Sequence, residues 1–260
     1  MCAYFCFKHL DMKKYFITLN LILLTNFIFS QNKGTVYYQE IRKLHFNIQG
    51  NAPPPPDLPT ENTNYTVLYF NEISSLYKND ESKQSDPMTM DEESGEGDRM
   101  IIKMSAPDNR VYCDLENKIM IRQEDFMQRK FLVENEIKSS GWKITGNQKT
   151  ILNYTCMEAV REDSLGKTIV WFTPAIPVSS GPQKFAGLPG LVLEANMDNG
   201  EQIILATRIS PELDEKQILK PKDGKKVSED EYNAIVDEKL KEMGVDRGNG
   251  GNVIIKIDDH

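Results

Sequence analysis

Apolar and polar residues alternate along most of this chain with a period of two. Alternation of this kind, rich in β-branched and aromatic residues, is typical of strands with one buried face. Runs with this pattern cover 34–44, 66–78, 100–105, 110–115, 118–123, 130–135, 151–161 and 167–173, and a further strand starts at Trp142. The pattern predicts a mainly β protein.

Turn-forming residues separate several of these runs. Asp108-Asn109, Glu116-Asn117 and the stretch 163–166 stand where hairpin turns would stand. The sequence Asp198-Asn199-Gly200 separates the runs LVLEANM and EQIILATRI. An Asn-Gly step between two such runs is a strong hairpin signal, so we expect an antiparallel pair there.

Residues 228–244 carry the one clear helical pattern. Ser228 and Glu231 form a capping box, and Gly244 supplies a left-handed stop. One stripe holds Tyr232, Ile235, Val236, Leu240 and Met243. The polar face is mainly acidic, which favours packing on a sheet over binding to a membrane surface. We therefore expect a curved antiparallel sheet or half-barrel, similar in architecture to lipoprotein carriers, with one covering C-terminal helix.

Two segments interrupt the regular pattern and are predicted to be loop insertions. Residues 46–62 contain four successive prolines, which exclude a central strand. Residues 80–98 contain eight acidic residues and one lysine, which predicts a disordered acidic loop. In a helix-loop-helix calcium site with Asp91 as the first position, Gly and Glu would be needed at the sixth and twelfth, but Glu96 and Ile102 stand there.

The N-terminal 30 residues have the pattern of a secretory leader. Lys13 and Lys14 precede an apolar stretch, 15–29, and Ser30 is a small residue suited to cleavage. Met12 is the expected start, with residues 1–11 an upstream extension. The alternative is a membrane anchor, but polar residues at 18, 20, 25 and 26 break the apolar stretch. We expect a single β-rich domain, 31–260, in the periplasm or secreted, without stable membrane insertion after cleavage.

Charge and cysteine content narrow the possible functions. The net charge of −8 becomes −10 once the leader is removed, and the chain has no basic stripe, so nucleic acid is a poor partner. Cys113 and Cys156 are the cysteines that remain in the mature chain. In an oxidising compartment they are predicted to form a disulfide, and the alternative is two buried thiols on separate strands.

Catalytic and metal-binding patterns are missing from the mature sequence. Its histidines are His45 and His260, and no zinc or serine-hydrolase motif is present. We expect no cofactor, no metal and no catalytic residue, although a hydrolase that uses two carboxylates stays open as a weaker alternative.

The stretch FAGLPGLVLEA, 185–195, contains two glycines around Leu188-Pro189. A phosphate-binding loop would lead into a helix, but here a strand follows, and Pro189 lacks an amide donor. Residues 188–191 fit a type II turn in which Gly190 has positive φ. We expect Gly187, Leu188, Pro189, Gly190 and Leu191 to form a tight turn that feeds a central strand.

The order of Trp142, then NYTCMEA, then IVWFTPAIPVSSGPQKFAGLPGLVLEA, then the Asn-Gly hairpin, resembles the GLPGLI family of exported bacterial proteins. The resemblance is close over 142–209 and extends more loosely over 34–209, and Val192 stands in place of the last Ile of the family name. It implies a Gram-negative cell envelope and genes near TonB-dependent outer-membrane transporters. No activity is established for that family.

A binding or interaction protein is therefore the main functional hypothesis. The partner would be an outer-membrane transport protein, docked through the Gly187–Leu191 turn. Alternatively, an apolar ligand would lie in the concave face of the sheet, lined by Trp171, Phe172, Ile176, Phe185, Leu188 and Leu191. Ordinary core packing is the competing interpretation for each of these side chains.

We predict that export removes the leader. N-terminal sequencing of the exported protein should begin at or near Gln31, because the leader has the charge and length of a cleaved signal. Recovery of residues 15–29 in a membrane fraction would contradict this prediction.

Overall fold

The computed structural model describes residues 31–44, 46–48, 60–83, 88–93, 99–104, 107–163, 166–242 and 255–257. All of them belong to one compact unit, Gln31–His260. The predicted leader, the proline run, both mature histidines, Met243 and Gly244 lie outside the described residues.

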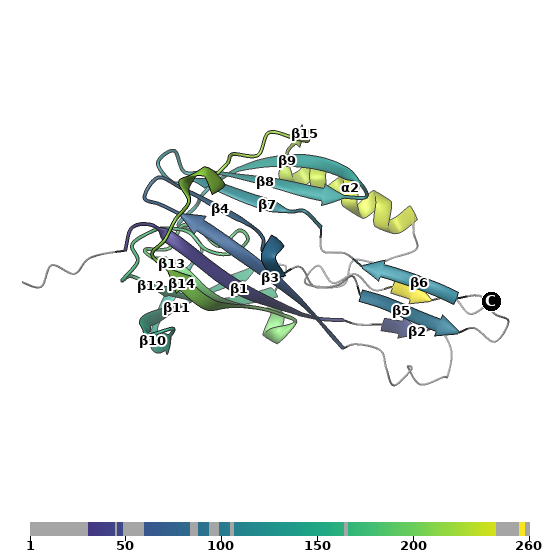
Figure 1. Cartoon of the computed structure of the whole chain (residues 1–260), viewed down its shortest axis with the longest axis horizontal. Helices are drawn as coiled ribbons and strands as arrows, with labels where there is room; N and C mark the ends of the chain where they lie inside the picture. Colours follow the sequence, from purple (N-terminus) through teal and green to yellow (C-terminus); the bar gives the residue numbers. More distant parts are fainter. Residues whose placement is uncertain are drawn as a thin grey trace, which may run out of the picture. The chain divides into compact units, whose positions relative to one another are not determined.

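A large, curved sheet dominates the described part of the chain (Figure 1). Its twelve strands, in spatial order, are β10 (Lys143–Ile151), β11 (Tyr154–Asp163), β12 (Gly166–Thr173), β13 (Leu191–Met197), β14 (Gln202–Ser210), β1 (Gly34–Lys43), β3 (Glu61–Phe70), β4 (Ser74–Asn79), β7 (Arg110–Asp114), β8 (Ile119–Phe126), β9 (Arg129–Glu136) and β15 (Lys225–Val227). All neighbours are antiparallel except β15, which runs parallel to β9. The sheet is not closed into a barrel, so the predicted open, mainly β fold is confirmed.

The curvature brings the two halves of the sheet together around one core. Buried side chains from β7 and β8, such as Cys113 and Met120, belong to the same cluster as Cys156 and Ala159 from β11. Alternation along β1 sends Val36 and Tyr38 into this core. Strands from both halves of the sheet thus bury apolar side chains in one core.

The 17-residue connection between β12 and β13, residues 174–190, lies on the inner side of this curve. Its apolar side chains are almost fully buried, and they are Ile176, Val178, Phe185, Ala186 and Leu188. Its backbone pairs with the start of β13, where Leu191 N–H donates to Ile176 O over 3.0 Å and Val192 N–H donates to Ser180 O over 3.0 Å. The concave face is therefore filled by the chain itself.

Helix α2 (Glu229–Glu242) begins with the predicted capping box. Ser228 N–H donates to the Glu231 carboxylate over 2.8 Å, and Glu231 N–H donates to Ser228 Oγ over 3.2 Å. Val236 and Leu240 are buried, as the stripe predicts. No helix among the described residues is long and apolar enough to cross a membrane.

The helix is fixed to the sheet through β8 and β9. The rings of Tyr232 and Phe131 meet edge to face, with centroids 5.6 Å apart. At the helix start, the Glu229 carboxylate accepts hydrogen bonds from Arg122 over 2.5 Å and from Asn135 over 2.8 Å. The predicted covering helix is confirmed.

Two predicted strand runs are in fact interrupted by turns. The run 66–78 contains the turn between β3 and β4, because the Asn71 side chain accepts the Ile73 and Ser74 amides over 3.0 and 2.8 Å. The run 151–161 starts with a turn at Leu152 and Asn153, both of which have positive φ. Apolar neighbours hid both turns in the sequence pattern.

The acidic segment also differs from its prediction as a loop. Within 80–98, a 3-10 turn covers Glu81–Lys83 and strand β5 covers Met88–Glu93. β5 pairs with β6 (Arg99–Met104) through backbone bonds that the charge pattern does not reveal. Because β6 pairs with β5 and β7 pairs with β4 and β8, Asp108-Asn109 is not a hairpin turn.

The remaining short elements complete the described chain. β2 (Phe46–Ile48), inside the first predicted insertion, pairs with β16 (Ile255–Ile257) as a separate parallel pair. Two short 3-10 turns cover Asp198–Gly200 and Glu215–Gln217. The first of these joins β13 to β14 at the predicted Asn-Gly hairpin.

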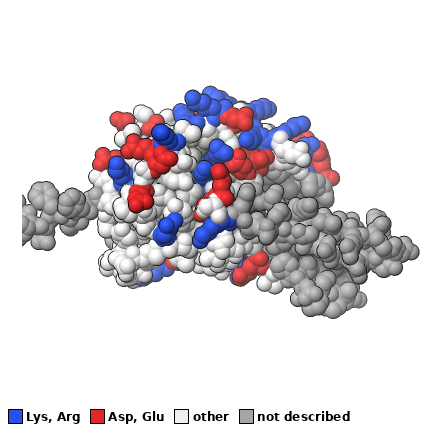
Figure 2. Space-filling model, viewed as in Figure 1, with Lys and Arg blue, Asp and Glu red and all other residues white. Residues whose placement is uncertain are grey.

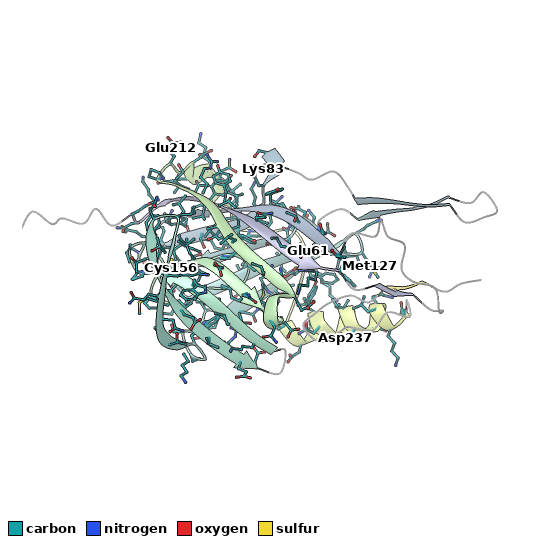
Figure 3. The ribbon with its side chains drawn as sticks, turned by 90° about the horizontal axis from the view of Figure 1, so that it is seen from below. Glu61, Lys83, Met127, Cys156, Glu212 and Asp237 are labelled. Carbon is teal, nitrogen blue, oxygen red and sulfur yellow. The ribbon has the colours of Figure 1, made fainter. Side chains whose placement is uncertain are left out.

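The predicted disulfide is not formed, because Cys113 and Cys156 are both free and buried. Cys113 lies on β7 beside Ser75, whereas the Cys156 thiol is 3.5 Å from the Tyr154 carbonyl oxygen on β11. These strands are far apart in the sheet order. Figure 3 shows Cys156 among the strands, away from α2, where Asp237 is labelled. The alternative of two buried thiols therefore describes this structure.

We predict that both thiols react only after unfolding. Burial raises the pKa of Cys113 to about 12 and that of Cys156 to about 11, so neither forms the reactive thiolate at neutral pH. Alkylation of mature protein purified without reductant, followed by mass spectrometry, should show no label in the native state and two labels in denaturant. If the denatured protein is labelled only after reduction, the two cysteines form a disulfide and this prediction is wrong.

Candidate functional site

The Gly187–Leu191 turn is largely buried, although Pro189 at its tip is exposed. Gly187 has φ +92° and Gly190 has φ +157°, so the predicted positive φ at Gly190 is confirmed. A Cβ at Gly187 would lie 2.5 Å from the Lys138 carbonyl oxygen, and one at Gly190 would overlap the Thr173 carbonyl oxygen. Both glycines are required because backbone from other segments passes directly against them.

The turn type differs from the prediction. Gly190 N–H donates to Leu188 O over 2.9 Å, which is the three-residue bond of a γ-turn centred on Pro189. A type II turn would use the Leu191 N–H, but that group donates to Ile176 O. Pairing of Leu191 with the buried connection therefore determines the turn.

The side chains predicted to line an apolar ligand site are packed as core. Phe172, Ile176, Phe185, Leu188 and Leu191 are each at most 3 % exposed. Such side chains leave no free surface for a ligand, so they fit the core interpretation.

Trp171 is the exception among them, because it is only partly buried. The ammonium of Lys149 lies 4.3 Å from the centroid of its ring. The same ammonium is 2.7 Å from the Glu194 carboxylate. A cation over the ring and an ion pair thus occupy the exposed side of Trp171.

Buried polar groups on the inner face are engaged with each other. Tyr77 donates a short hydrogen bond to Glu40, and Gln183 from the 174–190 connection donates to the same carboxylate over 3.4 Å. Burial raises the pKa of Glu40, although these bonds lower it in part. Thr66 completes the group with a 2.8 Å contact between hydroxyls. These hydrogen bonds replace those that the polar groups would form with water.

A second group of charges, of which Arg122 and Glu124 are partly buried, lies near the start of α2. Arg122 is 3.1 Å from Glu124, whose pKa is raised mainly by burial. Burial and the positive charges of Arg122 and Arg161 lower the pKa of Lys184. Arg122 also binds Glu229, so the group fixes the helix to the sheet.

These groups do not form a recognisable catalytic centre. Among the described residues, no cluster of three or more His, Cys, Asp or Glu side chains could hold a metal ion. The two thiols are buried with raised pKa values. Glu40 and Glu124 are the carboxyls that a two-carboxylate hydrolase would draw on, but both are already bonded within the protein.

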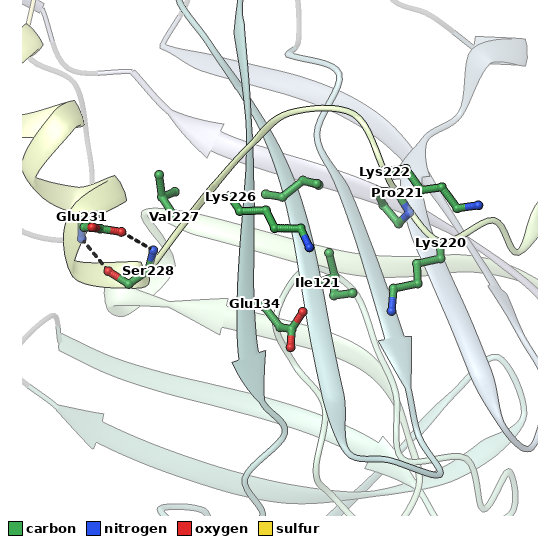
Figure 4. A pocket seen from close by; sticks show the side chains of 10 residues that line it. Ile121, Glu134, Lys220, Pro221, Lys222, Lys226, Val227, Ser228 and Glu231 are labelled. Carbon is green, nitrogen blue, oxygen red and sulfur yellow. Dashed lines mark hydrogen bonds between the residues drawn. The ribbon is translucent and has the colours of Figure 1, made fainter.

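An open hollow of about 470 Å³ lies on the outer face of β8 and β9, beneath the segment that leads into α2 (Figure 4). Ile121 and Leu132, both buried, form its apolar floor. The remaining lining residues are Glu134, Lys220, Pro221, Lys222, Lys226, Val227, Ser228 and Glu231. This volume falls within the range of small-molecule sites.

Lysines dominate the charge of this hollow. Lys220, Lys222 and Lys226 face two glutamates, and the Glu231 carboxylate already accepts the Ser228 amide, which lowers its pKa. Figure 2 shows lysine and arginine side chains gathered over the part of the molecule where Figure 1 places β15. A protein with a net charge of −8 thus has a locally basic site.

A hollow of similar volume lies on the other side of β15. It is lined by Arg129, Lys130, Phe131, Lys225, Ile235, Glu238 and Lys239. Successive residues of β15 point to opposite faces, so Lys225 serves this second hollow and Lys226 the first. Substitution of one lysine or the other can therefore distinguish binding in the first hollow from binding in the second.

The sequence did carry a signal for the basic hollow. The stretch LKPKDGKKV, 219–227, has four lysines in an otherwise acidic chain. Its apolar floor comes from strands almost 100 residues earlier, so composition alone could not show that these lysines border a cavity.

Comparison with protein families gives one short match. A family described as "Protein of unknown function (Porph_ging)" matches residues 160–194, which include the Gly187–Leu191 turn. No curated protein matches the chain.

Comparison with solved structures gives a likeness in fold. Two crystal structures of PNGF-II match, in space groups P21 and C2, with TM-scores of 0.51 and 0.52 and sequence identities of 17 % and 18 %. The matches cover 79 % and 78 % of this chain, but the chain spans only about a third of PNGF-II, 33 % and 32 %.

We predict that the turn governs stability. Gly190→Ala should lower the free energy of unfolding by about 2 kcal/mol or more, because the new Cβ meets the Thr173 backbone and the φ is unfavourable. Pro189→Ala should cost less than about 1 kcal/mol, because Ala can adopt the φ of Pro. Urea unfolding of both variants measures the difference. An unchanged stability of Gly190→Ala, together with loss of partner capture, would instead make the turn a recognition surface.

Proposed function

We propose that the mature chain is an exported, non-enzymatic binding or interaction protein of the GLPGLI family, which acts in the periplasm as an accessory of TonB-dependent outer-membrane transport. The long resemblance over 142–209 supports this proposal. The match of residues 160–194 to a family of unknown function falls within the same region.

The observation that carries the proposal is the filling of the concave face by residues 174–190. A carrier of apolar ligands needs an internal cavity, but the side chains of this connection occupy that position. The surfaces left for a partner are on the outside, and one of them is the hollow lined by Lys220, Lys222 and Lys226.

The hydrolase alternative has one observation in its favour, the raised pKa values of Glu40 and Glu124. A raised carboxyl pKa is typical of a general acid. However, the Glu40 carboxylate accepts hydrogen bonds from Tyr77 and Gln183. The Glu124 carboxylate forms an ion pair with Arg122. The structure therefore supports binding better than hydrolysis.

We predict that mature protein, residues 31–260, captures a TonB-dependent transporter from solubilised native envelope. The measurement is mass spectrometry of both the proteins and the lipids that are retained. Lys222→Glu/Lys226→Glu should reduce capture, whereas Lys225→Glu, on the opposite side of β15, should not. Retention of a stoichiometric lipid without a transporter would favour the carrier alternative.

A further inference from the structure

We propose that the hollow beneath residues 220–228 binds a small amphipathic anion, with a carboxylate or similar head group and an apolar body. This site extends the proposed function but does not depend on it, since a ligand can bind whether or not a transporter is the partner. The argument rests on the floor, the charges and the size of the hollow.

The floor provides an apolar contact surface. Ile121 on β8 and Leu132 on β9 are neighbouring outward-facing residues, yet they are only 4 % and 6 % exposed. Pro221 and Val227 from the overlying segment also line the hollow. Most of the hydrocarbon that an apolar body would remove from water here is its own, because Ile121 and Leu132 are already largely buried.

The rim provides positive charge that is not used within the protein. Lys222 and Lys226 have no ion pair among the residues that the structure describes. Lys220 has a longer-range electrostatic attraction to Asp114 but forms no ion pair with it. In contrast, Lys130 in the second hollow is paired with Asp223 at 3.4 Å. The first hollow therefore has cations available for an anionic head group.

The acidic residues of the hollow cancel this charge only in part, because the two carboxylates of Glu134 and Glu231 stand against three lysines. The Glu231 carboxylate is held by the Ser228 amide in the capping box, as the dashed lines of Figure 4 show. Glu134 comes within 4.0 Å of no lysine nitrogen among the described residues, so the three lysine head groups remain available. The combination of lysines above an apolar floor selects an anion with an apolar body over a neutral lipid.

The test uses two fluorescent probes that share an aromatic body. Anilinonaphthalene sulfonate carries an anionic group, and phenylnaphthylamine does not. Titration of folded mature protein should show saturable binding of the sulfonate and weaker binding of the neutral probe. Octanoate should displace the sulfonate, and octanol should not.

Matched variants locate the site. Lys222→Gln/Lys226→Gln should weaken sulfonate binding about tenfold, as expected for the loss of two partly exposed ion pairs. Lys225→Gln, which removes a lysine that lines the second hollow, should weaken it much less, and Lys222→Arg/Lys226→Arg should retain it. Circular dichroism establishes that each variant is folded.

Three outcomes would overturn the proposal. They are sulfonate binding that survives in Lys222→Gln/Lys226→Gln, an equal loss in Lys225→Gln, or equal binding of the neutral probe. Each can occur whether or not a transporter is captured from the envelope, so this failure and that of the proposed function are distinguishable.

Discussion

The structure depends on the burial of residues 174–190 against the inner face of the curved sheet. Ile176, Phe185 and Leu188 are almost completely removed from water, and each such side chain contributes about 1.5 to 3 kcal/mol. The connection also reaches several elements at once, since Ser180 contacts Ser75 on β4, and Phe185 meets Trp142 edge to face. The sheet need not close into a barrel, because the side chains of this segment cover its inner face and complete the core.

This packing gives the two glycines of the Gly187–Leu191 turn a structural role. Gly187 and Gly190 lie where the buried connection crosses the backbone of Lys138 and Thr173, and any side chain there would collide with a carbonyl group. Trp142, far away in the sequence, contacts the same connection through Phe185. Trp142 and the 174–190 connection are thus linked by packing.

Local signals in the sequence predicted much of the fold. The strands β1 and β13 and the capping box at Ser228 follow from periodicity and short-range bonds, which neighbouring residues decide. The turn at Asn71 was not predicted, because it lies inside an apolar run and depends on hydrogen bonds to the Asn71 side chain. The pairing of Cys113 and Cys156 could not be decided in this way, because it depends on the order of strands in the sheet. The basic hollow was missed for the same reason, since its lysines and its floor meet only after folding.

Local charge at the hollow can differ in sign from the charge of the whole chain because salt limits the range of electrostatic interactions. At physiological ionic strength, exposed charges farther apart than about 8 Å are largely screened from each other. An anion at the rim therefore interacts mainly with the charges that line the hollow, three lysines against Glu134 and Glu231, although the chain carries a net charge of −8. Lys226 lines the first hollow and Lys225 the second, although the charge of Lys225 also reaches Glu231 of the first hollow and helps to lower its pKa. A short edge strand, added parallel to β9, thus creates a basic site on each face of an otherwise antiparallel sheet.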